Sequence, residues 1–366
     1  MFTLSKTDKN GIRSGVIKTK HGEIKTPFFM PDATRGFVKL LSAEEIKKTQ
    51  TQALVVNTFH LYLQPGLEVI KAVGGVHKFM SWDGPLLSDS GGFQVFSLIH
   101  KNQKMGKITD DKVVFKSPLT GSWHELTPEK SIQIQFDLGV DMMVCLDDCP
   151  PNEISRASMK KSVNRTIAWA KRCKKEYLRQ IKIRRISSYN RPLLFAVIQG
   201  GTEIDLRRFC ASELKKIGFS GYGFGARPVD KDGNFLEEVL RQSAKFIPQD
   251  ALRFALGVGT PEDIKRCVAL GWDMFDCVIP TREGRHGKLF FKQADSYQTI
   301  SITNTKFRQD YQAINSVSKF NVLQNNSFAF LHHLFKLKDP LGARLASINN
   351  LEFYQLWLKN INKKIK

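Results

Sequence analysis

Two aspartates lie within or directly after apolar segments of strand length. Asp276 interrupts the run Met274–Ile279, which a proline ends, and Asp89 closes the segment that begins at Pro85. A carboxylate in a buried strand is costly unless it is paired or used. Two carboxylates on separate strand ends suffice to cleave a glycosidic bond, one as nucleophile and one as general acid/base. The alternative for Asp276 is an aspartate that caps a turn.

The residues that follow each aspartate indicate how a ligand could approach. Gly91 and Gly92 come just after Asp89, and two glycines let the backbone approach a flat ligand closely. Arg282 and Arg285 come after Asp276, in what the composition predicts to be a loop able to hold an anion.

The elements that must position these residues alternate along the chain. Helices are predicted to begin at Ser42, with a capping box to Glu45, and at Thr127, with proline at the first helical position. The expected strands are 53–57, 141–146, 193–198, 222–225, 254–258 and 274–279, and residues 1–35 read as short strands with turns. A polar residue or glycine follows most of these runs. The pattern predicts an α/β fold, and a (β/α)8 barrel and a doubly wound open sheet would both show it.

The composition favours a polyanionic partner. The 366 residues carry 56 basic and 35 acidic side chains, a formal charge of +21, which suits nucleic acid or an anionic membrane surface. No apolar run approaches the ~20 residues that span a bilayer, and the amino terminus lacks the apolar core of a signal peptide. We therefore expect a cytoplasmic nucleic-acid protein rather than a membrane protein.

The six cysteines and the basic segment 158–192 each allow two interpretations. The cysteines are scattered and form no CxxC pair, so we expect neither a disulfide framework nor a zinc site set by spacing. The basic segment interleaves Trp169 and Tyr177 among its lysines and arginines. Such a run is usually a solvated helix face, and its charge imbalance also favours some contact with phosphate.

Several long motifs resemble those of the tRNA-guanine transglycosylases, also called queuine tRNA-ribosyltransferases. The similarity runs from about Thr26 to Arg285 in the family's order. Its motifs are Asn57-Thr-Phe-His60-Leu, Ser88-Asp89-Ser-Gly-Gly-Phe93-Gln, Asp147-Asp-Cys149, Val197-Ile-Gln199-Gly-Gly201, Leu256-Gly-Val-Gly-Thr-Pro261 and Phe275-Asp276-Cys-Val-Ile-Pro-Thr-Arg282. The family fold is a (β/α)8 TIM-type barrel, so the resemblance favours the barrel over the open sheet.

The resemblance implies a transferase that exchanges a base in tRNA as part of queuosine biosynthesis. Guanine at the wobble position of tRNAs with a GUN anticodon leaves, and a 7-deazaguanine base enters. Asp276 matches the nucleophile that forms a covalent intermediate with the ribose, and Asp89 matches the general acid/base. Two displacements retain configuration, so we expect these carboxyls at the spacing of a retaining glycosidase.

The resemblance also assigns residues to the base and to the RNA. For Cys149 the alternative is a small buried residue, and for Arg282 and Arg285 it is two solvated arginines. The residues implied for the base are Ser90, Gly91, Gly92, Phe93, Asp147, Cys149, Gln199, Gly225 and Ala226. Those implied for the RNA are Gly257, Val258, Gly259, Thr260, Pro261, Thr281, Arg282, Glu283, Gly284 and Arg285.

The chain departs from the family at its zinc site. The family holds zinc in its carboxyl-terminal part, and the ligand positions here carry Ser318, Phe320, Leu323 and Asn349. None of these is a normal zinc ligand, so we expect no metal and no other cofactor. Packing must then hold this part of the chain, with Phe320 and Leu323 as substitute core.

A second departure concerns the incoming base. In the loop from Gly225 to Lys231, the family's usual leucine and glutamate are replaced by Arg227 and Lys231. The bacterial enzymes use this loop for the cationic aminomethyl group of preQ1, so the two basic residues should disfavour that group. Val229 and Cys149 keep the bacterial pattern, and both preQ1 and queuine stay open as the incoming base.

The resemblance divides the chain into a catalytic barrel, residues 1–300, and a helical subdomain, residues 301–366. In the second part, 328–336 and 351–361 are expected to be amphipathic helices. The active enzyme could be a homodimer. Two rival functions are a catalytically silent tRNA-binding partner subunit and an enzyme that exchanges bases in DNA. The presence of both Asp89 and Asp276 argues against the silent subunit.

Overall fold

Eight parallel strands form the central sheet of the computed structural model, which describes residues 1–8, 11–294 and 296–363. Their order in the sheet is β4-β14-β13-β12-β11-β10-β6-β5. A parallel bridge between Asp32 and Val55 joins the two edge strands, so the sheet closes on itself. The predicted barrel is therefore confirmed over the open sheet. The strands are β4 (Phe28–Pro31), β5 (Leu54–Val56), β6 (Leu86–Ser88), β10 (Met142–Val144), β11 (Leu193–Ile198), β12 (Gly221–Phe224), β13 (Leu252–Ala255) and β14 (Met274–Cys277).

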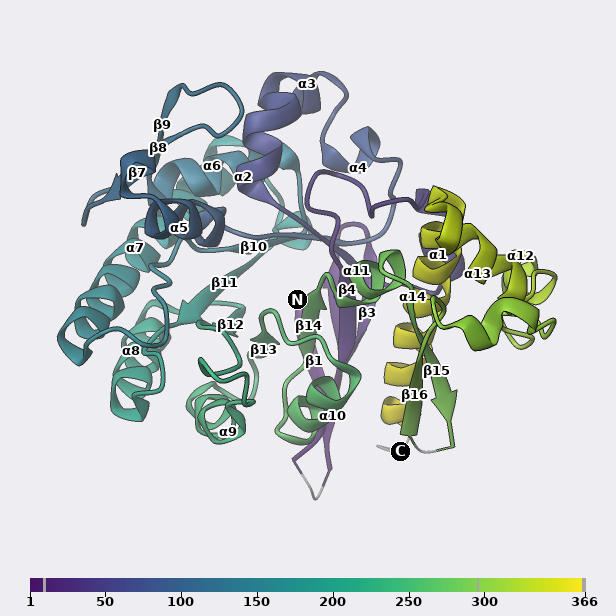
Figure 1. Cartoon of the computed structure of the whole chain (residues 1–366). Helices are drawn as coiled ribbons and strands as arrows, with labels where there is room; N and C mark the ends of the chain where they lie inside the picture. The colour runs from purple at the N-terminus through teal and green to yellow at the C-terminus, as the bar shows by residue number, and fades with distance from the viewer. Residues whose placement is uncertain (9–10, 295, 364–366) are drawn as a thin grey trace.

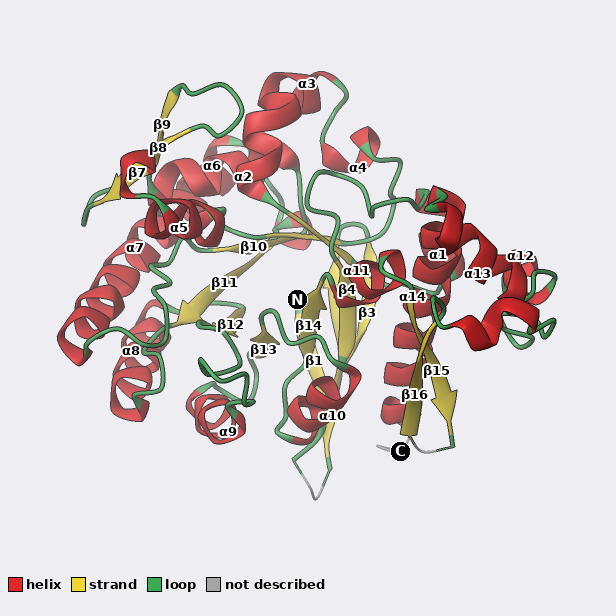
Figure 2. Cartoon of the chain, viewed as in Figure 1, coloured by secondary structure: helices red, strands yellow, loops and turns green. Residues whose placement is uncertain are grey.

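Helices surround the barrel and connect its strands (Figure 2). Both predicted helix starts are confirmed: Ser42 and Glu45 form the capping box, and the Thr127 side chain caps the helix that begins at Pro128. The helices are α1 (Ala43–Lys48), α2 (Thr58–Leu61), α3 (Leu67–Ala72), α4 (Val76–Phe79), α5 (Gly92–Lys101), α6 (Pro128–Leu138), α7 (Arg156–Ile183), α8 (Ile204–Ile217), α9 (Glu237–Phe246), α10 (Pro261–Ala269) and α11 (Ile279–Arg285). An antiparallel insert, β7 (Gly106–Ile108), β8 (Val113–Lys116) and β9 (Trp123–Leu126), follows α5.

One local prediction is wrong after β14. The strand ends at Cys277, and the residues expected to form an anion-holding loop form helix α11 instead. Pro280 lies in the first turn of this helix. Proline is compatible with that position because the first turn's N–H groups have no partner within the helix. The proline that was expected to end the strand therefore lies in the first turn of the helix instead.

The amino-terminal strands close one end of the barrel. β1 (Phe2–Thr7), β2 (Arg13–Thr19) and β3 (Gly22–Thr26) form an antiparallel sheet that leads directly into the start of β4. Ile17 and Ile24 are buried together with Phe195, Phe254 and Met274 of the barrel interior. This sheet therefore covers the amino ends of the barrel strands, and the opposite end is left to the loops that follow the strands.

The carboxyl-terminal part packs against the outside of the barrel (Figure 1). Tyr354 Oη donates a hydrogen bond to Gly259 O at 2.8 Å, and Trp357 Nε1 donates one to Pro261 O at 3.2 Å. The second predicted helix begins at Pro340 rather than at residue 351. The elements are β15 (Lys288–Gln293), β16 (Ser296–Ser301), α12 (Asn321–Gln324), α13 (Phe328–Leu337) and α14 (Pro340–Lys363). None of the helices in the part of the chain that the structure describes is long and apolar enough to cross a membrane.

Candidate active site

Asp89 follows β6 and is held by three neutral donors. Its Oδ1 accepts hydrogen bonds from the backbone N–H groups of Thr58 and Gly91, both at 3.0 Å, and Oδ2 accepts one from the Asn57 side chain. Burial, with a smaller contribution from the charges of Asp276 and Asp32, raises the pKa of Asp89 to about 7, although the N–H groups of Thr58 and Gly91 lower it. A carboxyl with a pKa near neutrality can both give and take a proton, as a general acid/base must.

Asp276 lies in β14 and is half-buried. Its Oδ1 accepts a hydrogen bond from Gly257 N at 3.0 Å. Burial raises its pKa to about 6, with the charge of Asp32 as a smaller cause. At neutral pH this carboxyl is therefore mostly ionised, which a nucleophile requires.

Asp32 is a third carboxyl at this end of the barrel, and the sequence analysis missed it. It directly follows β4, and Thr34 Oγ1 donates a hydrogen bond to it at 2.5 Å. Burial raises its pKa, and its charge acts on Asp89, Asp276 and Arg285. The signal was present in the sequence, because Asp32 follows the apolar run 28–31 as the other aspartates follow theirs.

Three predicted base-binding residues follow neighbouring strands. Asp147 comes after β10 and Gln199 after β11, and both are buried, with Gln199 Nε2 donating to Asp147 Oδ2 at 2.6 Å. Burial raises the pKa of Asp147 to about 7. Gly225 follows β12, and a Cβ there would lie 2.5 Å from Gln199 Nε2. Glycine at this position therefore leaves room for the Asp147–Gln199 pair.

The segment after Asp89 shapes the edge of this site. Ser90 is buried and its Oγ accepts a hydrogen bond from Gly92 N at 3.2 Å. Gly91 has a left-handed φ of 77° and lies against the backbone of Phe59. Phe93, in the first turn of α5, is 56% exposed, so its ring is available for stacking.

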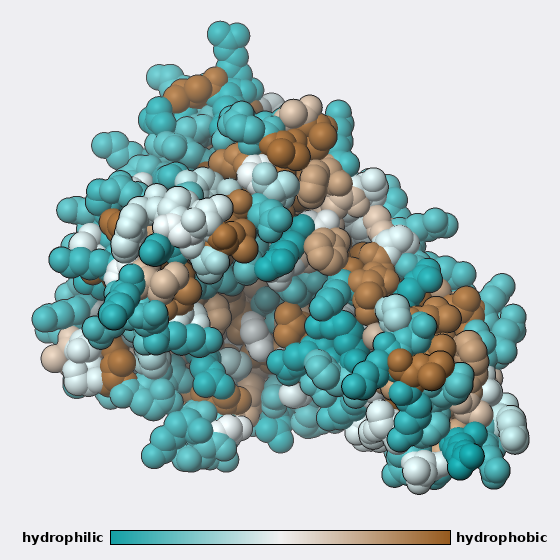
Figure 3. Space-filling model, turned by 45° about the horizontal axis from the view of Figure 1, so that its top comes forward, coloured by the Kyte–Doolittle hydropathy of each residue, from teal (hydrophilic) through white to brown (hydrophobic). Residues whose placement is uncertain are grey.

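The space-filling view shows a hollow near the middle of one face, with hydrophobic residues inside it (Figure 3).

Cys149 and Ala226 complete the predicted base-binding set. Cys149 is half-buried, and burial raises the pKa of its thiol to about 12. The thiol is therefore neutral and is no nucleophile. Ala226 adopts a φ of 137°, which L-residues rarely do, directly after Gly225.

Arg207 of α8 holds the loops behind the base-binding residues. Its guanidinium is buried and donates hydrogen bonds to three backbone carbonyls, those of Gly201 at 2.6 Å, Ile198 at 3.1 Å and Gly225 at 2.8 Å. It also lies over the Phe224 ring, 4.0 Å from the centroid. Burial lowers its pKa to about 9. Sequence analysis did not identify this residue, since a single arginine in an amphipathic helix is usually exposed.

Only some of the predicted RNA-binding residues are exposed. Five of these residues lie between β13 and the start of α10. Gly257 and Thr260 are exposed there, and the buried ones are Val258, Gly259 and Pro261. Thr260 also caps α10 by accepting a hydrogen bond from Asp263 N. In α11, Thr281 and Gly284 are buried against the carboxyl-terminal part, Glu283 and Arg285 are half-buried, and the Arg282 side chain is 50% exposed. Gly257, Thr260, Arg282 and Arg285 are thus the accessible members.

The basic segment forms most of helix α7, and its aromatic residues belong to the core. Trp169 and Tyr177 are buried. Arg165 pairs with Asp148 at 2.5 Å and Arg172 with Glu129 at 2.7 Å, so part of the positive charge stabilises the fold.

The positions that match the family's zinc ligands offer neither thiolate nor imidazole. Ser318 Oγ donates to Glu352 Oε2 at 2.5 Å, and Asn349 Nδ2 donates to Phe290 O at 3.0 Å. Phe320 and Leu323 are buried in the core, as expected. These side chains do not fit a zinc ion, because their polar atoms already bond protein groups and the other two side chains are apolar.

A (β/α)8 barrel that gathers Asp89, Asp276 and the Asp147–Gln199 pair at the carboxyl ends of its strands is suited to an enzyme that acts on a glycosidic bond. Comparison with known proteins identifies the family to which the chain belongs. Residues 8–366 match the family model described as queuine tRNA-ribosyltransferase. Proteins of that name from Staphylococcus aureus strains bovine RF122 / ET3-1 and JH9 are each 40% identical over 361 residues, covering 98% of this chain and 90% of theirs. The chain belongs to the queuine tRNA-ribosyltransferase family.

Proposed function

We propose that this chain replaces guanine at the wobble position of GUN-anticodon tRNAs with a 7-deazaguanine base, through a covalent ribosyl–Asp276 intermediate. The observation that carries the proposal is the pair of carboxyls with unequal environments. The pKa of Asp276 is about 6 and that of Asp89 about 7. One can therefore be an ionised nucleophile while the other still holds a proton.

The reaction consists of two displacements at the same ribose carbon. The Asp276 carboxylate attacks the anomeric carbon as the bond to guanine breaks, and the Asp89 proton goes to the departing base. Asp89 then takes a proton from the incoming base, whose nitrogen attacks the anomeric carbon and releases Asp276. Each displacement inverts the configuration, so the product retains it.

Different residues recognise the base and the RNA. Asp147 and Gln199 hydrogen-bond the polar edge of the base, and the exposed Phe93 ring stacks on its face. Arg282 and Arg285 contact the anticodon loop, since guanidinium groups suit phosphate and guanine.

The loop after β12 does not by itself decide between preQ1 and queuine. Arg227 and Lys231 are exposed, so solvent screens their repulsion of a cationic base. Asp230 accepts hydrogen bonds from Asp232 N and from Asn234, so its carboxylate is engaged in its own turn. We therefore expect R227L/K231E to change kcat/KM for preQ1 by less than about tenfold.

Exchange of labelled guanine into a GUN-anticodon tRNA tests the proposal. The protein should incorporate the label, and unlabelled preQ1 and queuine, added separately, should compete with it. A matched tRNA with another wobble base should stay unlabelled. Binding of the tRNA without any incorporation would instead support the silent partner subunit.

A further inference from the structure

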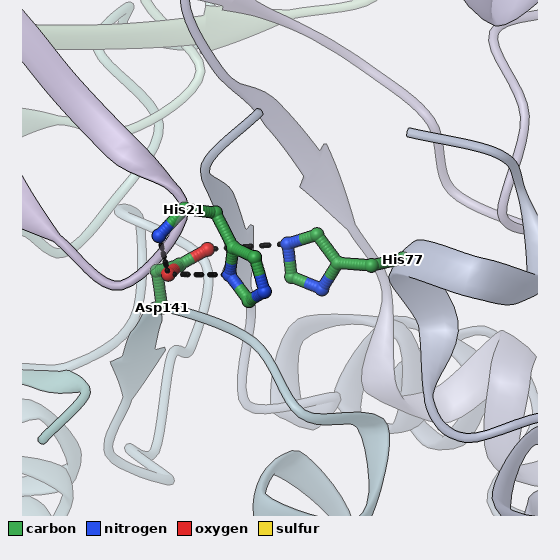
Figure 4. Close-up of side chains that lie close together, drawn as sticks. All are labelled: His21, His77 and Asp141. Atoms are coloured by element: carbon green, nitrogen blue, oxygen red, sulfur yellow. Dashed lines mark hydrogen bonds and ion pairs between the residues drawn. The ribbon is translucent and has the colours of Figure 1, made fainter. Parts of the chain in front are cut away.

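Two histidines and an aspartate, His21, His77 and Asp141, meet at the amino end of the barrel (Figure 4). His21 lies in the turn between β2 and β3, His77 lies in α4, and Asp141 directly precedes β10. Asp147 follows the opposite end of that same strand. His21 Nδ1 lies 2.8 Å from Asp141 Oδ1, and His77 Nε2 lies 3.2 Å from Asp141 Oδ2. One ligand atom from each of the three residues lies within 4.8 Å of the other two.

The cluster is largely buried, and one of its nitrogens is poorly hydrogen-bonded. The side chains of His21, His77 and Asp141 are 22%, 10% and 1% exposed. His77 Nε2 is buried, and its contact with Asp141 Oδ2 at 3.2 Å is an ion-pair contact without regular hydrogen-bond geometry in the part of the chain that the structure describes. A buried nitrogen with such a poorly directed partner can take an ion or a water as an additional partner.

The Asp141 carboxylate is already oriented by backbone groups. Leu86 N donates to Oδ2 at 2.9 Å, and His21 N donates to Oδ1 at 3.3 Å. Carboxylates that bind metals are held by such additional partners, which fix their direction. Two imidazoles and one held carboxylate form a nitrogen–oxygen ligand set typical of zinc and related ions.

We propose that His21, His77 and Asp141 form a binding site for a divalent transition-metal ion of the zinc and cobalt type. The two rings stack with centroids 3.7 Å apart and planes at 27°. Binding requires the rings to rotate so that Nδ1 of His21 and Nε2 of His77 point at one atom. Water completes the coordination from the exposed side of His21. Magnesium and calcium prefer oxygen ligands and do not suit this set.

The ion would have a structural role. It would connect the amino-terminal sheet, helix α4 and strand β10, three elements that are distant in sequence. The site lies at the end of the barrel opposite Asp89, so the ion takes no part in base exchange. Because the ion binds the folded chain, it should raise the unfolding temperature.

The test uses the untagged full chain, stripped of metal with a chelator. Equilibrium dialysis and the visible absorption of Co²⁺ should both show about one ion bound per chain. H77Q and H21Q should each weaken binding by at least about tenfold, since each removes a ligand. The matched control is H333Q, which removes an exposed histidine beside His332 and should leave binding unchanged. Mg²⁺ should not bind.

Thermal unfolding provides the second measurement. Zn²⁺ should raise the unfolding temperature of the natural chain and of H333Q, but not of H21Q. The H21Q variant also keeps the test decisive if H77Q does not fold, because His21 lies in a partly exposed turn. The proposal is wrong if neither ion binds the natural chain, if H21Q binds as tightly as the natural chain, or if H333Q loses the ion.

Discussion

Asp89 and Asp141 are carboxylates at opposite ends of the same barrel, and their partners differ. Asp89 is bound by an amide side chain and two backbone N–H groups, all of them neutral. Asp141 also accepts backbone N–H groups, but two imidazoles face it as well. Burial alone would raise the pKa of both, and the imidazoles lower that of Asp141, whereas the pKa of Asp89 rises to about 7.

The difference shows how hydrogen bonds can orient a carboxyl without fixing its charge. Neutral donors hold Asp89 in place and leave its proton exchangeable near neutral pH, whereas the partners of Asp141 stabilise its ionised form. Asp273 sets a limit to this argument. Arg13 lies 3.1 Å from it, yet burial is so complete that its pKa still rises to about 6.

The same change, aspartate to asparagine, should therefore act differently at each place. The largest effect is expected for Asp276→Asn, which removes the nucleophile and should lower the exchange rate by at least about 10³-fold. A tRNA adduct that survives denaturant on a gel should form with the natural chain and not with the variant. Binding of tRNA should be nearly unchanged. The matched control is Asp83→Asn, an exposed aspartate whose loss should leave exchange intact; an adduct in the Asp276 variant would reject the assignment.

Asp89→Asn should lower kcat by about 10²–10⁴-fold, the usual contribution of a general acid/base. In the natural chain, kcat/KM should rise with pH as Asp276 ionises near pH 6 and fall as Asp89 loses its proton near pH 7. Because the two carboxyls interact, the two apparent pKa values in the profile belong to the pair and not to either residue alone. The fall above pH 7 should disappear in the variant, and an unchanged fall in its pH profile would assign that limb to another group.

Asp141→Asn should affect stability and leave catalysis unchanged. The substitution weakens hydrogen bonds in a buried cluster, and we expect a loss of about 1–3 kcal/mol in the free energy of unfolding. Urea unfolding of the metal-free chain measures this loss, and guanine exchange well below the unfolding temperature should stay at the level of the natural chain. A large loss of exchange in the folded variant would mean that the two ends of the barrel are coupled.

The sequence predicts those site residues that come directly after strands. Asp89, Asp147, Gln199 and Gly225 each come directly after an apolar run, and parallel strands bring such residues to one end of a sheet. Closure of the barrel was not predictable from the alternation itself, since it depends on Val55 pairing with Asp32 beyond the end of β4.

A cluster whose residues are far apart in the sequence could not be predicted from the sequence. His21, His77 and Asp141 come from a turn, a short helix and a strand start, and no local pattern joins them. In helix α7 the many charges obscured a buried stripe, residues 169, 173, 177 and 181, which recurs every four residues. Pro280 was ambiguous because proline ends strands and also begins helices.

The smallest effect concerns the positions that match the family's zinc ligands. Ser318→Ala removes the hydrogen bond to Glu352, which still accepts one from Lys319 N at 2.8 Å, and the one that Phe320 N donates to Ser318 Oγ at 3.0 Å. We expect a loss of about 1 kcal/mol, or about 2 °C in unfolding temperature for a chain of this size. The matched control is Ser316→Ala at an exposed position nearby, which should cost nothing measurable.

A chelator should not add to that loss, because we propose that hydrogen bonds and packing take the place of zinc here. The measurement is best made with His77→Gln present throughout, so that any ion at the amino end of the barrel is removed from the comparison. Thermal unfolding of this background, with and without Ser318→Ala, should be the same in chelator as in zinc. A drop in unfolding temperature in chelator, together with zinc found by elemental analysis, would place a metal in the carboxyl-terminal part after all.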